Sequence, residues 1–426
     1  MKIGMQTWGV DGDIRPFCAL AGGLVAAGHK VTLAVTSIDK KNYSEFANAL
    51  GFEIHHVDVP FPDYTERQNR MINFILESTV NTPVQAFILA AKTFNPLVDD
   101  MFAISKKLAS ENDLLINYFV CHTLAAAAEA ENKKWITIYP APCYIQSSFI
   151  PPTTFPNINP VFTRIFWTLT RGFLNFLFLK HANRIRKQSG LPIIESTVHQ
   201  LWKSPWLNII ASSPVICDRA EDWDENIQYS GFLNLPEKVQ KWKMPKELTE
   251  FLARGEPPVF MTFGSFNKIG LNNNIKLFIK SIEKTGKRAI IQSYWSEATD
   301  FPDSENIYKT DSLPHAQIFP HCSLIVHHGG AGTIQTSLLY GLPSVVVSHG
   351  FDHTYFAKAL ERNHAGYKPL NKMFAGSSKI ASGINYISQN QHFRKNAKKL
   401  GDGIRVEKGV KKAVEMIEDF IKNNVK

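Results

Sequence analysis

The 426-residue sequence lacks the cysteine patterns that build disulfide scaffolds and zinc ribbons. It has no Cys-x-x-Cys pair, and its five cysteines are odd in number and far apart: Cys18, Cys121, Cys143, Cys217 and Cys322. This pattern is typical of reduced thiols in a cytoplasm. A secretory signal peptide is not expected, because Gln6 and Asp11 interrupt the apolar run that follows Lys2. We therefore expect a cytoplasmic protein.

The sequence also has no long hydrophobic run that is free of charge. Its most hydrophobic long segment, VFTRIFWTLTRGFLNFLFLK, contains three bases: Arg164, Arg171 and Lys180. These charges argue against a membrane-spanning helix. A long helix packed on its own domain is the interpretation we favour, because helical apolar stripes usually face a core. Peripheral membrane contact through residues 161–187 is the alternative, since aromatic and basic residues alternate there.

Charge is not concentrated in any arm of the chain. Lys and Arg exceed Asp and Glu by 47 to 38, a net charge of +9, which favours anionic partners. Because the excess is spread along the chain, we expect no nucleic acid partner; the phosphate of a small molecule would account for the charge equally well. Hydrophobic residues make up 44% and charged ones 20%, the usage of a soluble globular protein.

Short β-rich runs alternate with helical stretches in both halves of the sequence, which predicts an α/β fold with doubly wound parallel sheets. The polar, proline-containing stretch at 233–247 has the composition of a linker. We therefore predict a domain at 1–232, a second domain at 248–405 and a C-terminal helix at 406–426, whose place stays open. Two such domains form a cleft, and ligands bind beyond the carboxyl ends of the strands.

The most informative motif lies within SLIVHHGGAGTIQTSLLYGLPSVVVSHGFDH, residues 323–353. A buried strand passes through a glycine-rich turn into a helix that begins near Thr333, which predicts an anion site suited to a diphosphate. The motif has neither the lysine of a P-loop nor the spacing of a dinucleotide site, so a nicotinamide dehydrogenase is disfavoured. A tight turn without a ligand is the alternative. His327 and His328 are neighbours on a strand and point to opposite faces, so they cannot easily share a metal.

A second motif, TWGVDGDIRP, places two acids around Gly12 where the first strand should turn into the first helix. A metal clamp, a ribose or phosphate site, a helix cap and a catalytic base all fit Asp11 and Asp13 at this stage.

The sequence resembles a known family in four separated stretches. These are HHGGAGT with the downstream GLPSVVV and FDH, the N-terminal GDIRPFCALAGGLVAAGHKVTLAV, FGSF at 263–266, and SPVICDRAEDWDENIQYSGF before the linker. They are similar to the inverting, nucleotide-sugar-dependent glycosyltransferases of the GT-B fold, and most similar to the branch of sterol glucosyltransferases and vancomycin-type antibiotic glycosyltransferases. The resemblance covers both domains and implies two Rossmann-like domains facing a cleft.

The resemblance implies that Asp13 is the general base that deprotonates the acceptor hydroxyl, with Asp11 a turn residue. His328, the backbone at Gly330 and the hydroxyl of Thr333 would contact the donor diphosphate, and the backbone near Leu313 would hold the nucleobase edge. The donor site implied in full is Gly12, Ser265, Leu313, His328, Gly330, Gly332, Thr333, Asp352 and His353. No metal and no cofactor beyond the nucleotide-sugar substrate is implied.

Three positions depart from the family pattern. Ser312 stands where plant relatives carry a tryptophan that stacks on uracil, and Thr336 replaces their ribose-binding glutamate. His353 replaces the glutamine of an Asp-Gln pair, and histidine there occurs in members that use galactose or a pentose.

The expected activity is transfer of a hexose from a UDP-sugar or TDP-sugar, UDP-glucose or UDP-galactose above all, to a hydroxyl of a lipophilic acceptor with inversion. A nucleotide-sugar epimerase on the same fold and a non-catalytic nucleotide-sugar-binding protein are the alternatives.

Overall fold

The computed structural model describes residues 1–58, 83–153, 155–236, 242–264, 270–299, 301–350 and 352–425. It divides into two compact units. Within the described residues, the first unit contains 1–58, 87–236 and 407–425, and the second contains 83–86, the first turn of helix α4 (Pro83–Phe94), together with 242–406. Every strand pairing among them is parallel.

The first unit is built on a seven-stranded sheet in the order β3-β2-β1-β4-β5-β6-β7. Its strands are β1 Lys2–Gly9, β2 Lys30–Ser37, β3 Glu53–His56, β4 Leu114–Tyr118, β5 Trp135–Tyr139, β6 Leu207–Ile210 and β7 Ile227–Tyr229. Its helices are α1 Asp11–Ala26, α2 Ser44–Leu50, α4 Pro83–Phe94, α5 Val98–Glu111, α6 His122–Ala130, α7 Pro160–Gln188 and α15 Gly409–Asn424. All five residues of β4 and of β5 are buried, as expected for strands that are covered on both faces.

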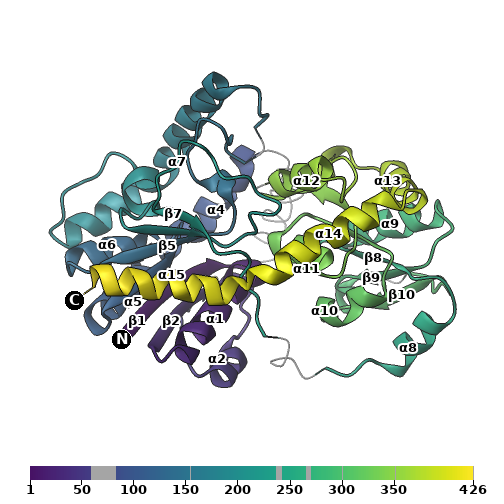
Figure 1. Cartoon of the computed structure of the whole chain (residues 1–426), viewed down its shortest axis with the longest axis horizontal. Coiled ribbons are helices and arrows are strands. Elements are labelled where there is room, and N and C mark those ends of the chain that lie inside the picture. Colours follow the sequence, from purple (N-terminus) through teal and green to yellow (C-terminus); the bar gives the residue numbers. More distant parts are fainter. Residues whose placement is uncertain are drawn as a thin grey trace. The chain divides into compact units, whose positions relative to one another are not determined.

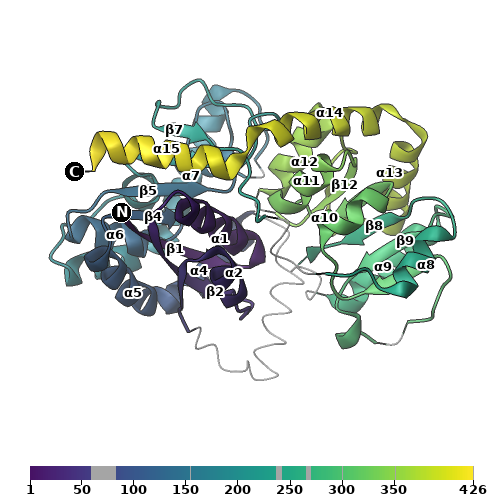
Figure 2. The same ribbon diagram turned by 60° about the horizontal axis from the view of Figure 1, so that its bottom comes forward.

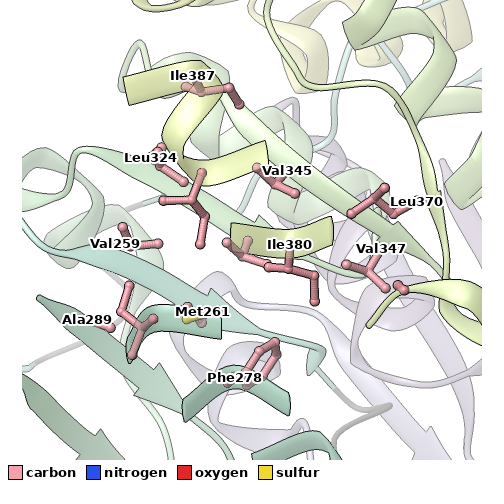
Figure 3. Packing of buried hydrophobic residues seen from close by; sticks show 14 of the residues in the cluster. Val259, Met261, Phe278, Ala289, Leu324, Val345, Val347, Leu370, Ile380 and Ile387 are labelled. Carbon is pink, nitrogen blue, oxygen red and sulfur yellow. The ribbon is translucent and has the colours of Figure 1, made fainter. Parts of the chain in front are cut away.

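The second unit is built on a six-stranded sheet in the order β10-β9-β8-β11-β12-β13. Its strands are β8 Val259–Thr262, β9 Ala289–Gln292, β10 Ile307–Thr310, β11 Leu324–His327, β12 Ser344–Ser348 and β13 Leu370–Asn371. Its helices are α8 Lys246–Ala253, α9 Leu271–Glu283, α10 His315–Ile318, α11 Ala331–Leu339, α12 His353–Arg362, α13 Ser377–Gln389 and α14 His392–Glu407. One face of the sheet packs against α9 and α13, where Phe278 and Ile380 meet Met261, Val345 and Val347 (Figure 3).

Helix α15 returns to the first unit and lies against α1 (Figures 1 and 2). A side chain on Gly23 of α1 would come within 2.5 Å of Val410, so glycine allows the two helices to approach closely. The helix begins at Gly409 rather than at the predicted residue 406, because Lys408 has a left-handed φ of 49° that ends α14. Helix α8 begins at Lys246, inside the predicted linker, since Leu248 and Phe251 are buried in a hydrophobic cluster.

Helix α7 has two different apolar faces. One is the predicted contact with its own domain: Thr163, Trp167 and Leu174 are buried, and the Trp167 indole donates a hydrogen bond to the Ile150 carbonyl at 2.8 Å. The other face leaves large hydrophobic side chains in solvent: Val161, Phe162, Ile165, Leu169 and Phe176. Within the described ranges, none of the helices combines the length and the hydropathy that crossing a bilayer requires.

Candidate active site

The turn between β1 and α1 depends on a glycine. Gly9 has a φ of 136°, a conformation that side chains rarely permit, and a Cβ there would lie 2.3 Å from Oδ2 of Asp13. The turn therefore brings the Asp13 carboxylate directly against the backbone at the carboxyl end of β1.

Two hydrogen bonds fix the Asp13 carboxylate. The backbone N–H of Val10 donates to Oδ2 at 3.0 Å, and the Tyr118 hydroxyl donates to Oδ1 at 2.8 Å. Burial raises the pKa of the Asp13 carboxyl to about 6 although both hydrogen bonds lower it, and the nearby charges of Asp39 and Asp11 raise it further. A carboxylate held in one orientation, with a pKa just below neutrality, is suited to accept a proton at physiological pH.

The neighbours of Asp13 in the motif lie in a different environment. Asp11 is the first residue of α1 and faces two surface cations, 3.7 Å from Arg15 and 3.6 Å from Lys41. Gly12 is exposed, and a Cβ there would meet nothing within 4 Å. The N-cap residue is Val10, and the Asp13 carboxylate accepts a hydrogen bond from its N–H. The side chain that caps the helix is therefore also the candidate base. Within the described chain, no group of three or more His, Cys, Asp or Glu side chains is arranged to hold a metal.

The glycine-rich turn of the second unit joins β11 to α11. Gly329 has a φ of 103°, and a Cβ there would lie 2.8 Å from Val346. Gly330 is the N-cap of α11 and has no side chain to cap the helix. The Thr333 and Ile334 N–H groups donate to its carbonyl, which leaves the N–H groups of Ala331 and Gly332 for an anion. A Cβ on Gly332 would meet nothing within 4 Å, whereas a Cβ on Gly330 would lie 2.6 Å from the His328 ring. The Thr333 side chain is half-buried on the first turn of the same helix.

The side chains of the two adjacent histidines lie in different environments, as expected for neighbours at the end of a strand. His327 is fully buried, and its Nδ1 accepts a hydrogen bond from the Gly329 N–H at 3.1 Å. His328 is half-buried, and its ring lies 4.8 Å from that of His353 and 6.3 Å from that of His349. Burial lowers the pKa of His328 to about 3, so its imidazole is neutral at pH 7 and can donate one N–H.

Three more of the predicted donor residues, Leu313, Asp352 and His353, follow strands at the carboxyl edge of the second unit's sheet. Asp352 is the N-cap of α12, and His353, its first residue, is buried with 6% of its surface exposed. The N–H of Leu313 donates to Oε1 of Gln292 at 3.1 Å. Ser265 lies outside the described residues.

Two residues near these groups were not expected from the sequence. Tyr118, at the end of β4, reaches Asp13 because β4 neighbours β1 in the sheet. Lys372 follows β13, and its ammonium lies 4.3 Å from the centre of the Phe263 ring at the end of β8. A prediction of the strand order could have identified both residues, because the carboxyl ends of parallel strands meet at one edge of the sheet.

Two surface pockets of the first unit, of ≈ 380 and ≈ 470 Å³, do not involve any of these residues. Both are lined by His199, Lys203 and Asp224. Their polar lining does not match a lipophilic acceptor.

Two units of parallel sheet and helices, each with polar groups beyond the ends of its strands, form the architecture of a GT-B glycosyltransferase. Comparisons with known proteins agree: the chain has the GT-B fold and is similar to glycosyltransferases along its length. Residues 290–418 match the family model described as erythromycin biosynthesis protein CIII-like, C-terminal domain.

Several relatives are glycosyltransferases by name. A sterol 3-beta-glucosyltransferase of Arabidopsis thaliana is 24% identical over 97% of this chain and 67% of its own length. That of Candida albicans is 24% identical over 98% of this chain, which spans only 27% of the relative. O-mycaminosyltylonolide 6-deoxyallosyltransferase of Streptomyces fradiae is 22% identical over 99% of this chain and 97% of its own length.

Solved structures have the same fold. The glycotransferase of kitacinnamycin superposes with a TM-score of 0.69 at 17% identity, over 98% of both chains. Glycosyltransferase VinC, solved in complex with DTDP, superposes with a TM-score of 0.67 at 16% identity, over 100% of both chains.

Proposed function

We propose that the protein transfers a hexose from a UDP-sugar or TDP-sugar to a hydroxyl of a lipophilic acceptor, with inversion at the anomeric carbon. The observation that carries this proposal is the Asp13 carboxylate, which is held by Val10 and Tyr118 and has a pKa raised to about 6. In the proposed reaction, Asp13 removes the acceptor proton as the acceptor oxygen attacks the anomeric carbon. The new C–O bond forms while the bond to the diphosphate breaks, so a single displacement inverts the configuration.

The donor diphosphate is proposed to bind at the N-terminus of α11. Backbone N–H groups after Gly330, the partial positive charge of the helix end and the Thr333 hydroxyl would stabilise its negative charge. His328 would donate an N–H to the departing diphosphate. We propose that these groups stabilise the departing diphosphate without a metal ion.

The rest of the predicted donor site is proposed on the resemblance. Asp352 and His353 would bind hydroxyls of the sugar, and Ser265 and Gly12 would complete the donor contacts. Because the Leu313 N–H already donates to Gln292, a nucleobase contact at this residue would use the Leu313 carbonyl. UDP-glucose and UDP-galactose are the preferred donors; the relatives named as glucosyltransferases support glucose, and the VinC complex keeps TDP among the candidates.

Calorimetric titration with UDP, TDP, GDP and NAD, at fixed salt and with and without magnesium, tests the proposal. We expect UDP or TDP to bind tightly and independently of magnesium, because the proposed cradle is made of N–H and hydroxyl donors. Binding of NAD, or of none of the four, would refute the diphosphate site and with it the donor class.

The acceptor is proposed to be lipophilic because the first unit exposes many apolar side chains. Phe149, Ile158 and the outer face of α7 are examples, at 39% and 56% exposure for the first two. Residues 71–80, also apolar in sequence, lie outside the described residues. A sterol, a polyketide, a flavonoid or a membrane lipid would fit this surface.

A cytoplasmic location with peripheral membrane contact is proposed through the outer face of α7. Val161, Leu169 and Phe176 are 62%, 62% and 82% exposed, and the exposed bases Arg164 and Lys180 lie on the same helix. Apolar side chains flanked by bases suit the surface of an anionic bilayer.

Flotation with phosphatidylserine-containing vesicles tests this contact. We expect the protein to float with the vesicles and the double variant Leu169→Glu, Phe176→Glu to remain in solution. Val406→Glu, which alters an exposed apolar residue of the second unit, is the matched control and should still float. A wild-type protein that stays in solution, or a double variant that floats equally well, would rule out this face.

A further inference from the structure

Lys372 is a half-buried cation that turns back over the carboxyl edge of the second sheet. It follows β13 and begins the short 3₁₀ helix η8 (Lys372–Phe374). Its ammonium donates a hydrogen bond to Oδ1 of Asn274 on α9 and lies 4.3 Å from the centre of the Phe263 ring. These contacts hold the charge beside the residue that follows β8.

No acidic side chain balances this charge within the part of the chain that the structure describes. Asn274 is neutral, and the ring of Phe263 attracts a cation only weakly compared with a carboxylate. Burial lowers the pKa of Lys372 to about 8, and no opposite charge offsets this effect. A cation removed from water without a partner destabilises the empty protein, so its presence calls for an anion supplied from outside.

The proposed diphosphate site lies next to this cation. Phe263, under the ammonium, is followed by Gly264, and a Cβ on Gly264 would lie 2.9 Å from the His328 ring. His349 lies near both Phe263 and His328: its ring centre is 4.7 Å from that of Phe263 and 6.3 Å from that of His328. Lys372 and His328 therefore flank the same short stretch of backbone at the end of β8.

We propose that Lys372 is a second anion-binding group of the donor site, whose ammonium contacts the diphosphate from the β13 side while the N-terminus of α11 contacts it from the other. The inference rests on the proposed function, because it takes the diphosphate as the missing counter-ion. It assigns the donor site a cationic residue that the glycine motif does not contain. Lysine binds phosphate as a mobile point charge, which suits a leaving group whose charge increases during the reaction.

The test compares wild type with Lys372→Met, which removes the charge and keeps a long apolar side chain. We expect affinity for UDP to fall by at least about 10-fold, as for the loss of one charge-assisted hydrogen bond. Affinity for uridine should change less than 2-fold, because uridine has no phosphate. The melting temperature of the variant without nucleotide should equal or exceed that of wild type, since a half-buried cation without an acidic partner has been removed.

Two further variants complete the design. Lys368→Met removes an exposed lysine just before β13, with the same change in net charge, and should bind UDP like wild type. Lys372→Arg keeps the charge and should recover part of the UDP affinity. Lys372→Gln, which also removes the charge, serves in place of the methionine variant if that does not fold.

The outcomes separate this inference from the proposed function. If wild type binds neither UDP nor TDP, the proposed function fails and the inference fails with it. If wild type binds UDP and Lys372→Met binds it within 2-fold as well, only the role of Lys372 is overturned. Equal losses for UDP and uridine would also overturn it, because they would indicate a general disturbance of the site.

Discussion

Asp13→Asn is expected to lower turnover by about 10²-fold or more while leaving the affinity for UDP nearly unchanged. The amide has almost the same size as the carboxylate, and its oxygen can still accept the Val10 N–H, so the turn between β1 and α1 should keep its geometry. An amide cannot take a proton from the acceptor hydroxyl. Initial rates at saturating donor, together with calorimetric UDP binding, separate the loss of a base from the loss of a binding site.

Asp11→Asn is the matched control for this variant. Asp11 is two residues away and carries the same group, but it pairs with surface cations, so we expect its turnover to stay close to that of wild type. The pH profile supplies a second readout: the pKa of Asp13 is about 6, and its basic form predominates above that pH. The wild-type rate should therefore fall as the pH drops through about 6, and Asp13→Asn should lose this limb. Unaltered turnover in Asp13→Asn would exclude the residue as the base.

His328→Ala is expected to weaken UDP binding by about 10-fold or more, since it removes an N–H donor from a half-buried position beside the glycine-rich turn. Uridine, which lacks the phosphates, should bind the variant nearly as well as wild type. Calorimetric titration of both ligands measures the difference.

His321→Ala replaces an exposed histidine of the same unit and should leave UDP binding unchanged. If His328→Ala binds UDP as tightly as wild type, the phosphate site lies elsewhere on the second unit. If both ligands lose affinity equally, the ring of His328 supports the packing of the sheet edge rather than the diphosphate.

The repeating alternation of apolar runs and helical stretches was enough to predict two parallel α/β units, because strands covered on both faces are almost continuously hydrophobic. Strands β7 and β13 could not be predicted in this way, because three and two residues are too few to establish a period. The place of α15 was also left open. An amphipathic pattern indicates that a helix has a buried face, but not which domain covers it.

Some residues of the candidate site could likewise be predicted from the sequence, and others could not. The glycines at 329 and 330 and the carboxylate at 13 could be found in sequence because the turn and the chemistry are local. Tyr118 and Lys372 could not, since Tyr118 is 105 positions from Asp13 and Lys372 is 98 positions from Asn274. Such pairs are created by strand order and by the direction of a side chain, which no local pattern records.

The return of α15 to α1 makes the second unit an insertion within the first. The described chain leaves the first unit after residue 236 and re-enters it at Glu407, and the flanking segments touch: a Cβ on Gly409 would lie 2.1 Å from the Phe232 carbonyl oxygen. The Glu407 carboxyl fixes the same junction, accepting a hydrogen bond from the Ser213 hydroxyl at 2.5 Å. An inserted unit whose two ends lie together is the arrangement in which domain insertion is best tolerated. The 242–406 segment of the second unit could thus be exchanged for that of a relative as one piece, provided that residues 407–425 remain those of the host.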